Sequence, residues 1–321
     1  MHIKFDHRTA CMAGVICLML IVSGCMPKQT ATIMQDKSVV GSSKASVDGV
    51  PFYPQLDFQC GPASLAMALE HAGVEITPEQ LRPALFVPKK RGSLQVEMLA
   101  TPRRYGMLAY KLKPMMAALL QEVQAGHPVI VFQNLGLQMA PQWHYAVVTA
   151  FDLNQKSITL HSGDIANDVM AISTFERTWV RADSWAMLVL SAGDMPATAN
   201  PNGYLTAVAM LEKEGFHRSA QQFYDAAITR WPESLAARIG SGNAHYALGK
   251  LNKAQQIYLQ ATLDFSDAAE AYNNLAQTYL DQKRYELAIT AIHHAIALDS
   301  SSDLYHQTWS EIMQKKQSSP G

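Results

Sequence analysis

The chain has 321 residues, of which 48% are hydrophobic, and 26 basic against 27 acidic residues give a formal net charge of −1. This length exceeds what one hydrophobic core usually organises, so we expect two domains. The near-neutral charge argues against binding through a broad basic surface, and we expect no nucleic acid among the partners.

Residues 1–24 have the pattern of an export signal. Basic residues precede an apolar run over residues 10–22, which is too short to span a membrane. The run ends in Ser23-Gly24-Cys25, which resembles the lipobox of bacterial lipoprotein signals. The resemblance implies that Cys25 becomes the first residue, carries lipid and anchors the chain to a membrane of the cell envelope. Because Met26 rather than an aspartate follows, it implies the outer membrane, with the protein facing the periplasm.

Residues 25–49 are polar and show neither a helical nor a strand period, so we expect a flexible tether there. Cys11 and Cys17 would leave with the signal and Cys25 would be lipidated. Cys60 is then the only free thiol of the exported chain. In an oxidising compartment, a cysteine without a disulfide partner is a candidate reactive group.

Cys60 precedes a strongly helix-forming run. Gly61 and Pro62 suit the start of a helix, the following residues are mostly Ala, Leu and Met, and Gly73 suits its end. Cys60 therefore lies at the N-terminus of a buried helix. The free amides and the positive dipole end favour an anion there, so we expect a lowered pKa for the Cys60 thiol. An inert buried cysteine is the alternative interpretation.

The elements that follow predict an α+β domain over residues 50–190. We expect a helix that starts at Thr77-Pro78, further helices over residues 93–106 and 114–124, and strands over residues 128–133, 144–151, 157–161 and 185–190. Helices come first and an antiparallel sheet afterwards.

A thiol nucleophile needs a base that can also protonate the leaving group, and histidine titrates in the right range. His144 begins an expected strand, where its ring can face a helix N-terminus, and is our first choice. His161 ends the next strand and is the second choice. To orient the imidazole we choose Asp164, with Ser162 in reserve.

Negative charge on a reacting carbonyl oxygen needs hydrogen-bond donors, which the backbone N–H of Cys60 and the side chain of Gln55 can supply. No closely spaced pair of metal ligands supports a zinc site, although Cys60, His144 and Asp164 together make one conceivable. The sequence has no glycine-rich phosphate loop. We therefore expect neither a metal nor a cofactor.

Three motifs together resemble one family: Cys60-Gly61-Pro62-Ala63 after Gln55, His144-Tyr145-Ala146-Val147-Val148, and Gly92-Ser93-Leu94. They resemble the bacteriocin-processing, double-glycine cysteine peptidases, a papain-like family, over residues 50–190. The resemblance implies that Cys60 is the nucleophile, His144 the base and Gln55 the oxyanion donor. Family members usually have Asp-Pro at the end of the strand after the histidine, where this chain has His161-Ser162-Gly163.

A linker over residues 191–200 precedes a repetitive helical region. Small residues recur there at intervals of 34 positions: Ala220, Ala254 and Ala288 form one set, and Ala227, Ala261 and Ala295 form another. This period is typical of tetratricopeptide repeats. We predict three repeats over residues 201–302, with a capping helix and tail over residues 303–321, and a protein partner on their concave face.

These patterns predict a lipid-anchored envelope cysteine peptidase that cleaves a peptide or protein substrate by a Cys60–His144 thiolate mechanism. The repeats would recruit the substrate or a partner. Two alternatives stay open: a non-catalytic scaffold with a degenerate peptidase domain, and an acyltransferase or amidase that uses the same dyad, because these residues define acyl transfer and not its substrate.

Overall fold

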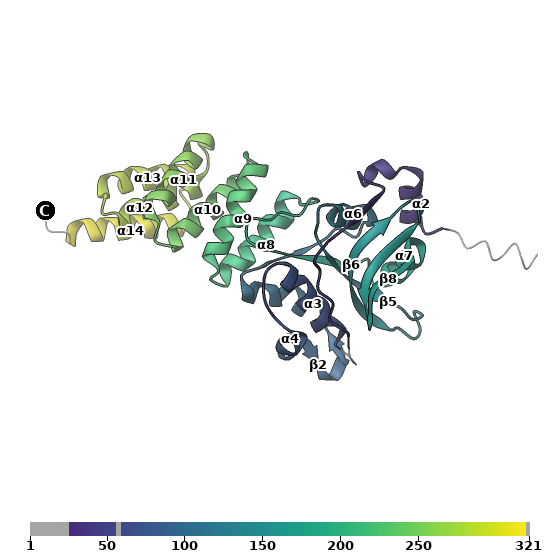
Figure 1. The fold of residues 1–321 in the computed structure, drawn as a ribbon. Helices are drawn as coiled ribbons and strands as arrows, with labels where there is room; N and C mark the ends of the chain where they lie inside the picture. The colour runs from purple at the N-terminus through teal and green to yellow at the C-terminus, as the bar shows by residue number, and fades with distance from the viewer. Residues whose placement is uncertain (1–25, 56–58, 319–321) are drawn as a thin grey trace, which may run out of the picture.

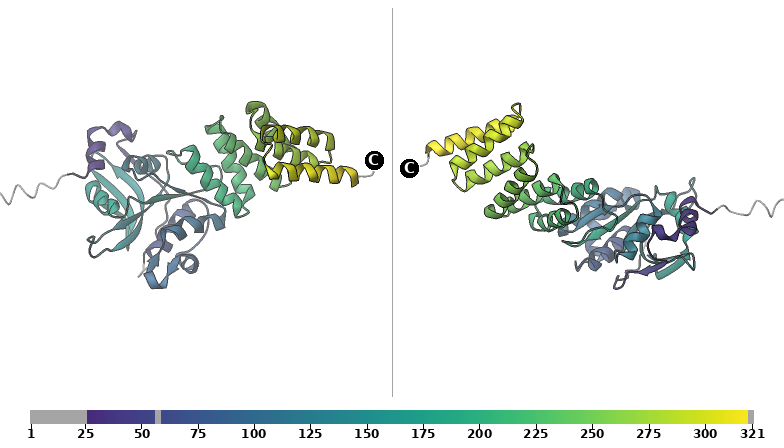
Figure 2. Two further views of the ribbon diagram at one scale, coloured as in Figure 1. Left: turned by 180° about the vertical axis from the view of Figure 1, so that it is seen from behind. Right: turned by 90° about the horizontal axis from the view of Figure 1, so that it is seen from above.

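The computed structural model describes residues 26–55 and 59–318. An N-terminal α+β domain is followed by an all-helical array of tetratricopeptide-like helix pairs, as the sequence predicts (Figure 1). The first described helix, α2 (Lys28–Gln35), and the last, α14 (Asp303–Ser318), lie at opposite ends of the molecule in every view (Figure 2). No described helix has the length and apolar character needed to cross a membrane.

One antiparallel sheet forms the middle of the first domain. Its strands are β1 (Lys44–Ser46), β4 (Leu108–Lys111), β5 (Val129–Asn134), β6 (Trp143–Asp152), β7 (Ser157–Ser162), β8 (Ile165–Ala171) and β9 (Ala186–Leu190). They lie in the order β4-β9-β5-β6-β7-β8, and β1 pairs with the second half of β6, beyond the end of β5. A separate hairpin pairs β2 (Phe86–Val87) with β3 (Gly92–Ser93).

Helices cover both faces of the sheet. One core contains residues of α3 (Cys60–His71), α4 (Pro78–Leu85) and α5 (Gln95–Ala100), and the other contains residues of α2, α6 (Met116–Gln124) and α7 (Ile172–Val180). Three short 3-10 helices complete the domain: Lys37–Val39, Pro88–Lys90 and Thr101–Tyr105.

Strand β6 supplies side chains to both cores in alternation. Tyr145 and Val147 belong to the core under α3, whereas Ala146 and Val148 belong to the core under α6 and α7. This alternation explains why β6 reads as a continuous apolar run, since both of its faces are covered. It also brings the backbone of β6 next to the N-terminal end of α3.

The tether expected over residues 25–49 is wrong for residues 26–49, which are folded onto the first domain. Ile33 and Val40 are buried and belong to its core, and β1 joins the sheet. The buried carboxylate of Glu176 accepts hydrogen bonds from the backbone N–H groups of Gln29 and Thr30. The few apolar residues of this segment are too widely spaced to show a period. Cys25 lies outside the described residues, so its lipidation stays a prediction.

Other differences come from weak local patterns. The structure adds β4, β8 and α7, and it divides the expected helix over residues 93–106 into α5 and a 3-10 helix that contains Pro102. β8 is an edge strand whose side chains are mostly exposed, and it contains the polar Asn167 and Asp168, so it lacks the apolar signature of the other strands. The remaining expected helices and strands lie within a few residues of their predicted positions.

The repeats form three helix pairs with α14 packed behind them. The pairs are α8 (Pro201–Lys213) with α9 (His217–Arg230), α10 (Leu235–Ala247) with α11 (Leu251–Asp264), and α12 (Ala269–Asp281) with α13 (Tyr285–Leu298). Glycines in α10 allow close packing, because a Cβ on Gly242 would lie 2.3 Å from the ring of Tyr258. In this least regular pair, Ser241 Oγ donates a hydrogen bond to Asp225 at 2.8 Å.

The first repeat shares a core with the N-terminal domain. Tyr204 and Val208 of α8 belong to the same buried cluster as Leu108 of β4, whereas α12 and α13 belong to a separate cluster. The predicted linker over residues 191–200 is also fastened, since the buried Glu122 carboxylate accepts hydrogen bonds from the backbone N–H groups of Ala197 and Thr198. The first repeat is therefore an extension of the N-terminal domain.

Candidate active site

The Cys60 thiol lies at the first residue of α3, partly buried beside β6. The backbone N–H groups of Tyr145, Gly61 and Cys60 itself favour the anionic form of its sulfur. Two of them are free because the first turn of a helix has no internal acceptors, and the third comes from the sheet. The sulfur thus occupies a position suited to receive negative charge.

Burial nevertheless raises the pKa of the Cys60 thiol, and the three backbone donors only partly oppose this effect. The expected lowering of the pKa is therefore wrong for the free protein. α3 packs with nine of its residues buried, so the helix start that supplies the donors also takes the sulfur out of water. At neutral pH the resting group is a thiol.

His144 is the second residue of β6, and its ring is oriented by the neighbouring strand. Its Nε2 lies 2.9 Å from Ser162 Oγ, at the end of β7. The pairing of β7 with β8 shifts between Leu160 and Ser162, an irregularity of the kind that redirects a side chain near the end of a strand. Burial lowers the pKa of His144 to about 4, so the imidazole is neutral at neutral pH and can accept a proton.

Cys60 lies beside β6, the strand whose second residue is His144. In the part of the chain that the structure describes, no hydrogen bond joins the thiol to the imidazole, and His144 Nδ1 has no hydrogen-bond partner. Contacts between catalytic groups are often long before substrate binds, so a dyad does not require this hydrogen bond in the free protein.

Two other candidates have different surroundings. Asp164 is exposed and forms no hydrogen bond with the His144 ring among the described residues. The reserve candidate, Ser162, provides that contact. His161 is buried, with Nε2 3.3 Å from the Val50 carbonyl oxygen and Nδ1 accepting from the Asn167 N–H. Because both of its nitrogens are engaged, His161 has a structural role here.

Gln55 is tied into the fold on both sides of its amide. Its Nε2 donates to the Tyr145 carbonyl oxygen at 3.2 Å and to Ser64 Oγ at 3.3 Å, and its Oε1 accepts from the Gly163 N–H. Both amide hydrogens therefore have acceptors within the protein. In this conformation Gln55 connects α3, β6 and the β7–β8 turn, and the backbone N–H groups at the start of α3 are the better placed oxyanion donors.

The surroundings of the thiol include Ser93, a residue of the Gly92-Ser93-Leu94 motif to which the sequence assigns no role at the site. The Ser93 side chain packs directly on Gly61, where an added Cβ would lie 2.3 Å from Ser93 Oγ. This hydroxyl is buried and has no hydrogen-bond partner among the described residues. A glycine is thus required at position 61 because β3 approaches the start of α3 closely. In the sequence, the only signal of this close approach is the glycine that follows Cys60.

Exposed apolar side chains lie on the loop that leads into His144. Leu137 and Met139 are 73% and 99% exposed, and Trp143 is 53% exposed while stacked on Phe132 at 5.2 Å between ring centroids. Exposed apolar groups of this kind suit contacts with a bound chain.

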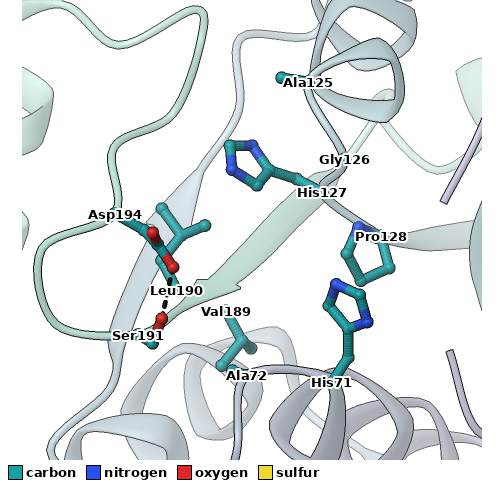
Figure 3. A pocket seen from close by; sticks show the side chains of 10 residues that line it. All are labelled: His71, Ala72, Ala125, Gly126, His127, Pro128, Val189, Leu190, Ser191 and Asp194. Carbon is teal, nitrogen blue, oxygen red and sulfur yellow. Dashed lines mark hydrogen bonds between the residues drawn. The ribbon is translucent and has the colours of Figure 1, made fainter. Parts of the chain in front are cut away.

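Another pocket lies at the opposite end of α3, away from Cys60. His71 and His127 line it with Ser191 and Asp194, which are hydrogen-bonded to each other (Figure 3). His127 already contacts the Glu122 carboxylate at 2.8 Å. No group of three potential metal ligands occurs among residues 26–55 and 59–318. This pocket offers no nucleophile or base arrangement comparable with that at Cys60.

Comparison with known families agrees with this division of the chain. Residues 47–187 match the peptidase C39-like family, and residues 204–254 and 239–303 match the tetratricopeptide repeat. A search of curated proteins found no match.

Solved structures similar to the chain cover one domain or the other. A C39-like peptidase from Bacillus anthracis is 21% identical, over 46% of this chain and 98% of its own, with a TM-score of 0.40. The tetratricopeptide domain of Arabidopsis OM64 is 17% identical, over 36% of this chain and 95% of its own, with a TM-score of 0.34. That of Sgt2 from Aspergillus fumigatus is 18% identical, over 39% and 87%, with a TM-score of 0.36. The first domain is thus similar to the peptidase C39-like family, and the helical array is similar to tetratricopeptide repeats, modules that generally bind other proteins.

Proposed function

We propose that this chain is a cysteine peptidase of the cell envelope, anchored by lipid at Cys25, with Cys60 as nucleophile and His144 as base. The observation that carries the proposal is the position of Cys60, at the start of α3 and beside β6, the strand whose second residue is His144. The match of residues 47–187 to the peptidase C39-like family supports it. The bacteriocin-processing specificity is not part of the proposal.

The pKa values favour a mechanism in which proton transfer accompanies attack. With Nε2–H donating to Ser162 Oγ, His144 Nδ1 keeps its lone pair and can accept the thiol proton. The sulfur then adds to the substrate carbonyl carbon, and the backbone N–H groups at the start of α3 stabilise the oxyanion. The imidazolium returns the proton to the departing amine. Water, deprotonated by the same ring, hydrolyses the thioester and releases the acid.

Ser162 would orient the ring less firmly than a carboxylate does. A hydroxyl can donate or accept, so it fixes the tautomer weakly, and it adds no negative charge to stabilise the imidazolium. We therefore expect the Cys60 thiol to react slowly in the free protein and faster once bound substrate brings it and the His144 ring together. The repeats would then supply affinity by holding a protein substrate, or its carrier, near the exposed apolar loop.

The test is a comparison of new peptide N-termini in envelope extracts incubated with the parent chain, with Cys60→Ala and with His71→Ala. His71 lies on the same helix at its far end and serves as the matched control. The proposal expects the same new termini with the parent and with His71→Ala, and none with Cys60→Ala. Identical profiles for all three proteins would favour the scaffold. Turnover of small amides without any peptide cleavage would favour the amidase or acyltransferase.

A further inference from the structure

An apolar groove lies where the described chain begins, and no described part of the chain covers it. Its volume is about 420 Å³, and it runs between α2, the first 3-10 helix and the start of α6. Lys28, Thr32, Ile33, Val39, Pro114 and Met115 are among the residues that line it. Met115 and Val39 are 52% and 38% exposed, and Met26 beside them is 45% exposed.

Only a short length of chain separates the groove from Cys25. Three peptide units separate Cys25 from Lys28, so their Cα atoms lie at most about 11 Å apart. From Gln29 onward the chain is fixed, because the Gln29 N–H donates to Glu176 and the Gln29 side chain accepts from the Met116 N–H at 2.6 Å. A lipid on Cys25 would therefore bring this face, and not a long tether, to the membrane.

The charges around the groove suit an anionic surface. Lys28 lines the groove, Lys113 lies next to Pro114, and both lysines are exposed. The nearby Asp36 carboxyl accepts hydrogen bonds from the N–H and hydroxyl of Ser38, which lower its pKa and keep it ionised, so it offsets one of the two lysine charges. Apolar side chains flanked by lysines are the composition of surfaces that lie at a phospholipid interface.

We propose that the groove face rests directly on a phospholipid bilayer, with Met26, Val39 and Met115 at the acyl boundary and Lys28 and Lys113 at the headgroups. This inference rests on the proposed anchor at Cys25. It fixes the orientation of the molecule, because α14 lies at the end opposite α2 (Figures 1 and 2). The repeats then project away from the membrane, and the candidate active site lies between them and the bilayer.

The experiment uses the chain from Cys25 onward with the change Cys60→Ser, which leaves Cys25 as its only cysteine. Cys25 is coupled to maleimide phospholipid in vesicles of phosphatidylcholine with phosphatidylglycerol, and amide hydrogen exchange is compared with that of the uncoupled protein. We expect slower exchange confined to α2, the first 3-10 helix and the start of α6. The double variant Met115→Asp with Val39→Asp should lose this protection, whereas Leu304→Asp, on exposed α14, should keep it.

Binding of the uncoupled protein to the same vesicles gives the second measure. Each of Lys28→Glu and Lys113→Glu should weaken it about fivefold or more, the contribution expected of one lysine near an anionic surface. Absence of protection in the coupled protein, or equal protection over the whole surface, overturns the proposal. Protection that appears without vesicles and grows with protein concentration identifies a second copy as the occupant and also overturns it.

Failure of the anchor itself is measured separately, by mass spectrometry of the N-terminus of the chain isolated from cells. An unlipidated Cys25 together with protection in the coupled protein would contradict the anchor and leave the docking face intact. A lipidated Cys25, without slower amide exchange in the coupled protein, would support the anchor and contradict the docking face.

Discussion

Glu122 and the Cys60–His144 pair are both buried polar sites of the same domain, but their hydrogen bonding differs. The Glu122 carboxylate accepts from the Ala197 N–H, from the N–H and hydroxyl of Thr198, and contacts His127. At the candidate active site, the imidazole has one side-chain partner and the Ser93 hydroxyl has none among the described residues. Buried polar groups in folded proteins are nearly always paired, so the Ser93 hydroxyl has capacity left for a water or a ligand.

This difference in hydrogen bonding indicates that Glu122 contributes to the stability of the fold, whereas the groups near Cys60 contribute to activity. Glu122 fastens the segment that leads to the first repeat, where its four contacts belong to the folded state alone. The groups near Cys60 have spare hydrogen-bonding capacity, which stabilises nothing until a substrate carbonyl and a developing charge arrive. Substitutions should therefore affect stability at Glu122 and activity at Cys60, with little overlap.

The largest effect is expected for Cys60→Ala. Removing the nucleophile should lower peptide cleavage by roughly 10⁴-fold or more, because the remaining groups of such a site act only with it. Stability should change by less than about 1 kcal/mol, since the thiol has no side-chain partner and alanine suits a helix start within the buried face. Turnover by the purified chains and urea unfolding measure the two quantities. A large loss of stability with cleavage retained would reverse the assignment.

For Glu122→Ala we expect the opposite outcome. The N–H groups of Ala197 and Thr198 lose their acceptor, which should reduce the free energy of unfolding by about 3 kcal/mol. Cleavage by the folded fraction should keep its kcat/KM. Urea unfolding monitored in the first domain measures the change, with Glu233→Ala as an exposed control. An unchanged unfolding midpoint would show that the carboxylate does not hold the segment.

The contact between His144 and Ser162 is the intermediate case, and pH tests it. Cleavage needs a neutral imidazole, so kcat/KM should hold at acidic pH and fall only near the His144 pKa of about 4. Ser162→Asp places an anion at Nε2, which favours the imidazolium and should move this acid limb upward by about 1 pH unit or more. Ser162→Ala should lower kcat about tenfold and leave the limb nearly in place. Identical pH profiles for all three proteins would exclude Ser162 as the orienting group.

Sequence patterns predict the positions of the main groups but not their state. Gly61 and Pro62 predict that Cys60 starts a helix. The apolar run after His144 predicts that His144 lies on a strand, and the structure packs that strand against the helix. The 34-residue recurrence predicts the repeats. All of these are local signals, each contained in a short stretch of chain or in a fixed period.

What the sequence does not predict depends on contacts between distant segments. The pKa of Cys60 reflects how deeply α3 packs against β6, which no local pattern reports. Ser162 reaches the His144 ring because the β7–β8 register shifts between residues 160 and 162, and a regular strand would give no reason to prefer it over Asp164. Likewise, residues 28–46 fold because Glu176, far along the chain, binds their backbone.

The smallest effect, and the sharpest use of the contrast, is expected for Ser93→Ala. Its hydroxyl is buried beside Gly61 without a partner, so removing it deletes no hydrogen bond of the folded state. Stability should stay the same or rise by up to about 1 kcal/mol, because the free protein no longer buries an unsatisfied oxygen. If the hydroxyl binds substrate, KM for a cleaved peptide rises while the free energy of unfolding does not fall. Urea unfolding and steady-state kinetics on the same preparation distinguish these outcomes. A fall in the free energy of unfolding would show that the hydroxyl is hydrogen-bonded in the folded protein and, like Glu122, stabilises the fold.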